Sequence, residues 1–436
     1  MSPELIGLLG IAVLLAMLAF RVPVAIAMFI VGLAGVTILR NERVALSFLA
    51  SEGFSIASNA DLLVIPLFIL MGNVATESGM SRRLYDAAYA WIGHWRGGLA
   101  SATVIGSGGF AALSGSSVAS ALTMGRVSLG EMERFRYANS LACGSVAAGG
   151  TLGILIPPST GFVLYAILTQ ESIGRLFLAG VLPGLLLIAL FVATILILTT
   201  VNPALGPKGP VSTWAERGRA SFRSLPLILL VLTTIGGIYG GFFSPTEAAG
   251  IGALLAIIYG LVTRTLSLRG LYRALIDSVS TTAVVMLILI AAHVFGPFLA
   301  LSHLSTAVGN FLTALPIGPY GVLIVILASY LVLGCFMEGY AMLVLTMPIF
   351  FPVVTGLGFD PIWFGVVVVV MLEMGLITPP VGINVFIVKS VAPRVDLSEI
   401  FRGVLPFLIA MVLLVALLIL FPQIALILPN TMLGAV

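Results

Sequence analysis

A short motif with two adjacent prolines occurs twice in this chain, at matching positions in its two halves. Residues 153–158 read GILIPP, and residues 375–380, 222 positions further on, read GLITPP. The sequence GVLP also recurs, at Gly180 and at Gly403, with an offset of 223. Separate matches on nearly one offset are typical of an internal repeat. Because a proline inside a helix breaks it, the repeat also predicts where a helix is interrupted in each copy.

The repeated unit is strongly apolar. Hydrophobic residues make up 60% of the 436 residues and charged residues only 8%, against roughly 25% charged in a soluble domain. Apolar runs such as 185–198 with its flanks and 404–421 reach the ~20 residues needed to cross a bilayer. We therefore predict an all-α integral membrane protein, with a first repeat over 1–200, a polar cytoplasmic linker over 201–223 and a second repeat over 224–436.

The positions of arginine and lysine predict how the two copies are oriented. Cytoplasmic loops of membrane proteins carry an excess of these residues. Six arginines flank the segment 97–125 of the first copy, whereas its counterpart at about 319–347 lies within residues 274–388, which contain no Lys or Arg. The first segment is therefore expected to open to the cytoplasm and the second to the other face. We predict that the two repeats are inverted.

Each copy is expected to contain a re-entrant helical hairpin followed by a broken helix. The hairpins are predicted over 97–125 and 321–346, because glycine and serine or a charged residue interrupt the apolar sequence at the centre of each. Irregular backbone at membrane depth is tolerated only where protein or a water-filled cavity satisfies it. The broken helices are predicted over 136–170 and 361–388, where the proline pairs remove N–H donors.

The hairpin tips and the helix breaks are the candidate binding sites. The first tip, 114–117, reads SGSS, and the second, 335–339, reads CFMEG. Carbonyl groups freed at a helix break can coordinate Na⁺, and helix N-termini attract anionic groups. We therefore predict two pseudo-symmetric ion sites with a substrate site between them. The candidate substrate contacts are Ser114, Ser116, Ser159, His293, Glu338 and Asn384.

Each candidate also has a structural interpretation. The serines could be small packing residues, Glu338 could cap nearby N–H groups, His293 could bond to backbone, and Asn384 could be an internal cap. Glu373, before the second break, is expected to hold the loop together instead of contacting substrate. Glu247, in the sequence SPTE, has the form of a helix start, and capping is its favoured role.

Five segments carry a resemblance to a known family. They read IPLFILMGN, LSGSSV, GTLGILIPPS, FSPTEAA and EMGLITPPVGIN, and begin at Ile65, Leu113, Gly150, Phe243 and Glu373. Together they strongly resemble the large membrane subunit, of the DctM type, of tripartite ATP-independent periplasmic (TRAP) transporters, within the ion transporter superfamily. The resemblance covers essentially the whole chain. It implies Na⁺-driven import of a carboxylate-bearing organic anion across the bacterial inner membrane by an elevator motion.

The resemblance also implies partners and ion ligands. The partners would be a periplasmic binding protein and a small four-helix membrane subunit, expected as a separate polypeptide because this chain begins directly at the large subunit. Na⁺ is expected as the coupling ion, and no other cofactor is expected. A nucleic-acid partner is not expected either. In the helix before the second hairpin, where some relatives carry a basic residue, this chain offers His293 and no Lys or Arg. Carried over residue by residue, the sodium sites would involve Ser114, Gly115, Ser116, Ser117, Gly153 and Pro157 in the first copy, and Glu338, Gly339, Gly375, Thr378 and Pro379 in the second.

Two other kinds of protein compete with this interpretation. A self-sufficient Na⁺/carboxylate symporter or a Na⁺/H⁺ antiporter could use the same hairpins and breaks, and dependence on a soluble binding protein would separate them. The sequence ALSG at 112–115 is close to a serine nucleophile motif, which makes an intramembrane serine hydrolase a remote alternative. It lacks the first glycine, and only His293 and His303 could serve as bases. An enzyme is therefore not expected.

Overall fold

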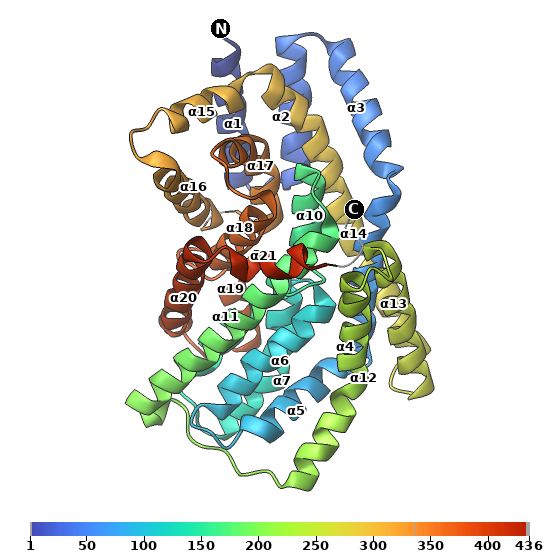
Figure 1. Cartoon of the computed structure of the whole chain (residues 1–436), viewed down its shortest axis with the longest axis vertical. Helices are drawn as coiled ribbons and strands as arrows, with labels where there is room; N and C mark the ends of the chain where they lie inside the picture. The colour runs from blue at the N-terminus through green and yellow to red at the C-terminus, as the bar shows by residue number, and fades with distance from the viewer. Residues whose placement is uncertain (1, 336, 433–436) are drawn as a thin grey trace.

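The computed structural model describes residues 2–335 and 337–432, and every regular element in these ranges is a helix (Figure 1). By length and composition, seven of the described helices could cross a membrane, or eight if one bent pair counts as a span. The apolar run 185–198 lies in α11 (Ile173–Val201), and the run 404–421 lies in α20 (Leu397–Leu420) except for its last residue. The prediction of an all-α integral membrane protein is confirmed.

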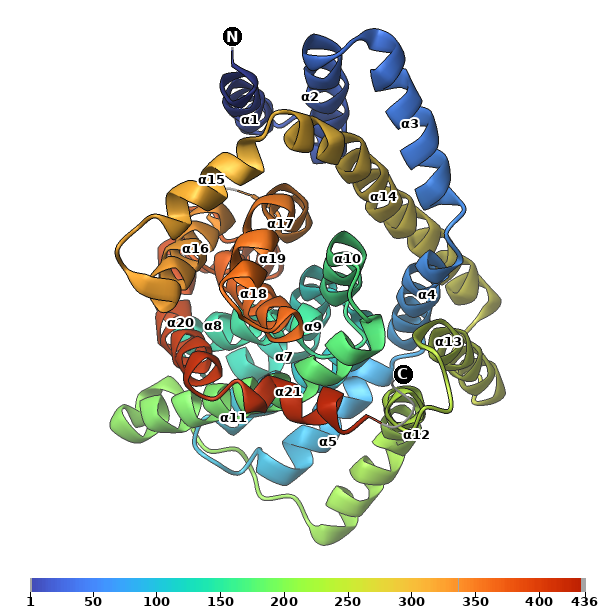
Figure 2. The same cartoon turned by 45° about the horizontal axis from the view of Figure 1, so that its top comes forward.

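One group of helices forms a curved band along one side of the molecule (Figure 2). It combines segments from both halves of the chain, because α2 packs against α14 and α4 packs against α13. Gly35 allows the close packing of α2 on α14, since a Cβ at this position would collide with the Phe298 ring. The band comprises α1 (Pro3–Ala19), α2 (Val24–Leu39), α3 (Glu42–Ala57), the 3₁₀ turn η1 (Ala60–Leu63), α4 (Val64–Glu77), α12 (Trp214–Tyr239), α13 (Pro245–Val262) and α14 (Leu268–Leu301).

Two short amphipathic helices, α5 (Met80–Ile92) and α15 (Leu304–Thr313), lead from the band to the hairpins. The first hairpin consists of α6 (Gly98–Ser114) and α7 (Ser117–Arg134), and the second of α16 (Gly318–Gly334) and α17 (Gly339–Gly356). The first tip can turn so tightly because Gly115 has a φ of 56°, which glycine adopts without steric cost. The second arms of both hairpins continue beyond the predicted ends at 125 and 346.

Both proline pairs interrupt a helix, as their sequence predicts. In the first copy, α8 (Asn139–Gly150) and α9 (Leu152–Leu155) stop before Pro157, and α10 (Thr160–Thr169) continues with a bend of 41°. In the second copy, the break separates α18 (Pro361–Gly375) from α19 (Ile383–Val391). In both pairs the bond between the prolines is cis. Figure 2 shows α9, α10 and α18 near the middle of the molecule, enclosed by the other helices, with the short C-terminal helix α21 (Gln423–Asn430) beside α11.

Capping determines where two of the long helices begin. Ser244 and Glu247 form a capping box at the start of α13, so the capping role predicted for Glu247 is confirmed. Thr213 and Glu216 form a second capping box at the start of α12. The predicted linker 201–223 is therefore helical from Trp214 onward, and its first part contains the end of α11 at Val201 and the 3₁₀ turn η2 (Pro203–Leu205).

Candidate functional site

The tip of the first hairpin lies directly on the first helix break. A Cβ on Gly153 would come within 2.5 Å of the Ser116 carbonyl oxygen, so only glycine allows this approach. The Thr160 hydroxyl, just after the break, donates a hydrogen bond of 2.7 Å to the Gly115 carbonyl oxygen. The sequence prediction that Ser114–Ser117 and the first break form one site is consistent with these contacts.

The same tip is joined to the second half of the chain by a buried carboxylate. The Ser117 hydroxyl donates a hydrogen bond of 2.7 Å to Oε1 of Glu373, which lies on α18 close to the second break. Glu373 is completely buried, and its Oε2 atom has no hydrogen-bond partner among the described residues. Glu373 thus connects two segments 256 positions apart. The sequence by itself predicts only that Glu373 holds its own loop together.

Asn384 lies close to the backbone of Ser117. Its side-chain amide nitrogen and the Ser117 carbonyl oxygen both border Gly150. Asn384 is fully buried, and neither polar atom of its side chain has a partner within the described part of the chain. Burying polar groups without partners costs free energy, and burying a charge costs considerably more. The cluster of Ser117, Glu373 and Asn384 is therefore suited to hold a cation, a proton or a polar ligand.

A second contact links the two halves on the other side of the first break. The Thr160 hydroxyl shares a hydrogen bond of 2.5 Å with the hydroxyl of Tyr340, which lies in the first turn of α17. The first break thereby contacts both hairpins. Tyr340 was not among the residues that the sequence singled out, because nothing in the sequence near Tyr340 indicates a partner 180 positions away.

The second hairpin tip does not repeat the geometry of the first. Gly375, the counterpart of Gly153, packs against Gly334 at the end of α16. The nearest atom to a Cβ on Gly339 is Leu372 Cβ at 3.9 Å. The Thr378 hydroxyl donates to the Met374 carbonyl oxygen at 2.6 Å, and Pro379 is exposed. Among the described residues, which leave out Phe336 of the second tip, the two predicted sodium sites therefore differ in their contacts.

Glu338 faces a cavity of about 360 Å³ between the second hairpin and the band. Arg21, from the turn between α1 and α2, lines the same cavity. Although Glu338 is the N-cap residue of α17, its side chain makes no capping hydrogen bond. The capping interpretation of Glu338 is thus wrong, and its carboxylate is directed to a space that a ligand could enter.

Several predicted substrate contacts form hydrogen bonds within the protein. The Ser116 and Ser159 hydroxyls accept hydrogen bonds from Ala119 N at 3.3 Å and Phe162 N at 3.2 Å, which caps α7 and α10. His293 shares a hydrogen bond of 3.0 Å with the Leu289 carbonyl oxygen, the alternative considered for it. Ser114 is bonded to the hydroxyl of Ser120 at 3.0 Å. Pro157 borders an apolar groove.

Comparison with known proteins places the chain in a family. Residues 11–424 match the family described as the tripartite ATP-independent periplasmic transporter, DctM component. The chain is 38% identical over 403 residues to the C4-dicarboxylate TRAP transporter large permease protein DctM of Pseudomonas aeruginosa, covering 92% of this chain and 93% of that protein. It is 35% identical over 426 residues to the sialic acid TRAP transporter large permease protein SiaM of Vibrio cholerae, covering 96% and 97%.

A solved structure shares the fold at low sequence identity. The YdaH transporter of Alcanivorax borkumensis is similar with a TM-score of 0.55 and 16% identity, over 88% of this chain and 90% of that one. The relatives are named as transporter permeases, which points to a transporter and away from a hydrolase. The predicted family and the multi-pass inner-membrane location are confirmed. The chain belongs to the DctM family, the large permease component of the tripartite ATP-independent periplasmic transporters.

Proposed function

We propose that this chain imports a carboxylate-bearing organic anion together with Na⁺, and that an elevator motion of the hairpins and broken helices carries both across the membrane. The cluster of Ser117, Glu373 and Asn384 carries the proposal. A carboxylate buried inside a membrane protein marks an ion or proton pathway by default. A Na⁺ ion beside Glu373 Oε2 would compensate the buried charge and supply the missing partner of the Asn384 oxygen.

The relatives and the donors near the site support this substrate class. The named relatives transport a C4-dicarboxylate and sialic acid, both of which carry carboxylates. Hydroxyl groups and helix N-termini, such as the start of α10 at Thr160, are suitable donors for such a group. We place the substrate between the first tip and Tyr340, where Thr160 already contacts both hairpins.

Coupling would arise because Na⁺ orders the site that binds the anion. Ser117 belongs to the first hairpin and Glu373 and Asn384 to the second broken helix, so an ion held among them fixes both copies in one arrangement. An ion shifts an equilibrium only if it binds one state better than the other. The empty site is therefore expected to bind substrate weakly.

The word tripartite in the family description implies two further components. We propose that these are a small four-helix membrane subunit and a periplasmic binding protein that delivers the anion. Uptake of a labelled organic acid is measured in proteoliposomes that contain this chain and its small subunit, with loaded binding protein outside. We expect uptake to require both the binding protein and an inward Na⁺ gradient.

The same measurement separates the rival transporters. Equal uptake with and without the Na⁺ gradient contradicts the proposal. Na⁺-dependent uptake that needs no binding protein indicates a self-sufficient symporter. Na⁺ flux coupled to opposite proton flux, with no uptake of any organic acid, indicates an antiporter. The proton would then occupy Glu373.

A further inference from the structure

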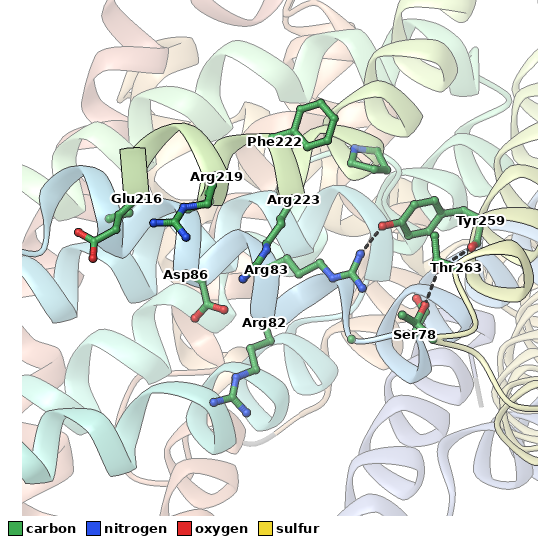
Figure 3. Close-up of a pocket in the computed structure, with 15 residues that line it drawn as sticks. Ser78, Arg82, Arg83, Asp86, Glu216, Arg219, Phe222, Arg223, Tyr259 and Thr263 are labelled. Atoms are coloured by element: carbon green, nitrogen blue, oxygen red, sulfur yellow. Dashed lines mark hydrogen bonds between the residues drawn. The ribbon is translucent and has the colours of Figure 1, made fainter. Parts of the chain in front are cut away.

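A large polar cavity lies between α5, α12 and α13, away from the hairpin tips and the breaks (Figure 3). Its volume is about 950 Å³, and four arginines border it. Arg82 and Arg83 come from α5, and Arg219 and Arg223 come from α12. Figure 3 shows Arg83, Arg219 and Arg223 from the two helices around the same space. Neither the predicted ion sites nor the predicted substrate site involves these residues.

The positive charge of this cavity is only partly compensated. Two carboxylates, Asp86 and Glu216, also border it. Among the described residues, the ion pairs are Arg134 with Glu131 and Arg273 with Glu77. None of the four arginines at the cavity is therefore within ion-pair distance of a described carboxylate. Arg83 donates instead to the hydroxyl of Tyr259. Four guanidinium groups thus share one cavity, without a paired acid.

Two carboxylates cannot balance the charge of four guanidinium groups. Glu216 Oε2 accepts hydrogen bonds from the Thr213 backbone N–H at 2.7 Å and from the Thr213 hydroxyl at 2.9 Å, so it is committed to the cap of α12. Burial raises the pKa of Asp86, and the nearby Arg82 and Arg223 oppose this shift. Four arginines therefore face two carboxylates at this cavity, which leaves an excess of positive charge. An excess of clustered guanidinium groups favours an anion with several oxygen atoms, because each group can donate two parallel hydrogen bonds.

An apolar surface continues from the cavity along α12 and α13. Phe222 borders the cavity and is 75% exposed, and Leu229, seven residues further on, lies on the same face of α12 and is exposed as well. On α13, Leu255 lies one turn from Tyr259 and is also exposed. A charged pocket beside an exposed apolar surface suits a phospholipid, because the headgroup and the acyl chains can contact the two parts at once. The arginine distribution predicts that this face is cytoplasmic, where anionic lipids attract basic residues.

We propose that this arginine pocket binds a phosphate group, of the kind carried by an anionic phospholipid headgroup or by a small soluble phosphate compound. The bound phosphate would fasten α5 to α12, since each helix contributes two arginines. As α5 leads from the band to the first hairpin, the ligand would stabilise the junction between them.

The test uses the full chain with its small subunit in detergent. Binding of phosphatidylglycerol, phosphatidylcholine and glycerol 3-phosphate is titrated by native mass spectrometry. The Arg219→Gln/Arg223→Gln variant is compared with Arg134→Gln, which removes an arginine that is exposed on α7 and outside the pocket. Each arginine near an anionic headgroup contributes about fivefold to affinity, so we expect a loss of roughly twentyfold in the double variant and no loss in Arg134→Gln.

The probes distinguish the source of the phosphate. A loss confined to phosphatidylglycerol supports a lipid headgroup, and a loss for glycerol 3-phosphate supports a soluble ligand. If the double variant binds every probe as tightly as Arg134→Gln does, the proposal is wrong. The unfolding temperature without any probe shows whether the double variant is folded. Should it be unfolded, the single variants Arg219→Gln and Arg223→Gln replace it, each with an expected loss of about fivefold.

Discussion

At the scale of single residues, Glu373 is the side chain on which the proposed ion coupling depends most. The Glu373→Gln variant keeps the volume and the hydrogen bond from Ser117 but removes the charge that would bind Na⁺. A hydrogen bond or contact to a charged group contributes about 1.5–3 kcal/mol, so the Na⁺ concentration for half-maximal uptake should rise at least about tenfold.

The matched control is Glu131→Gln, which removes an exposed carboxylate on α7. Uptake is measured in proteoliposomes over a range of external Na⁺ concentrations. Unchanged Na⁺ activation in Glu373→Gln would exclude this carboxylate from the ion site. A normal Na⁺ response together with a new dependence on pH would instead assign it to proton movement.

The close approach of the first tip to the first break predicts that Gly153 cannot be replaced without cost. A Cβ on Gly153 would meet the Ser116 carbonyl oxygen at 2.5 Å, and overpacking of this kind typically costs 1–3 kcal/mol. Gly153→Ala should therefore lower the unfolding temperature and slow uptake. Gly130→Ala is the control, since a Cβ there meets nothing within 4 Å. A stable, fully active Gly153→Ala protein would contradict the packing of tip and break.

The residues of the site were predictable where their chemistry is local. Gly115, Gly153 and the proline pairs favour a tight turn, a close backbone approach or a helix break through their own local chemistry. Glu373 and Asn384 were noticed as polar groups in apolar sequence. That Glu373 bonds to Ser117 could not be deduced, because the pairing depends on how two distant helices pack.

At the scale of helices, the contact between Thr160 and Tyr340 connects the first break to the second hairpin. If this contact couples the two elements, Thr160→Val and Tyr340→Phe should have effects that are not additive. Removing one hydroxyl leaves the other without this partner, and the interaction is expected to contribute about 1 kcal/mol. A double-mutant cycle on the apparent substrate affinity for uptake measures it. Strictly additive effects would show that the two hydroxyls act independently.

The lengths of the hairpin arms were harder to predict than their existence. The charged residues from Arg126 to Arg134 indicated the end of the first hairpin at 125, yet they form the last turns of α7. A helix that emerges from the membrane keeps its backbone hydrogen bonds, so a change to polar composition marks the membrane surface and not the helix end. The predicted linker 201–223 is too long for a related reason. Its polar residues from 214 onward belong to α12, which begins with a capping box.

At the scale of the whole molecule, the repeat predicts two pseudo-symmetric ion sites, and in the structure the contacts at the two sites differ. Gly153 contacts the first tip, whereas its counterpart Gly375 contacts Gly334. Symmetry in the sequence fixes which elements each copy contains. It does not fix their relative positions, because a transporter in any one state holds its two copies in different environments.

The elevator motion is a property of the whole molecule and is tested by restraining it. Val24 on α2 and Ala341 on α17 line the same cavity, one on the band and one on the second hairpin. With Cys143 and Cys335 replaced by serine, Val24→Cys and Ala341→Cys are joined by a short bifunctional thiosulfonate, which a reductant later removes. If the hairpins move against the band, joining the two should reduce uptake at least about tenfold, and reduction should restore it.

The control pair joins two helices within the band. Asn73 on α4 and Ser278 on α14 are hydrogen-bonded at 2.9 Å, so Asn73→Cys and Ser278→Cys can be linked without restraining any movement between band and hairpins. This linked protein should transport like the unlinked one. Full uptake by the linked Val24→Cys/Ala341→Cys protein would rule out a large displacement between band and second hairpin. The anion would then have to cross by local opening of the tips alone, with the two groups of helices remaining in place.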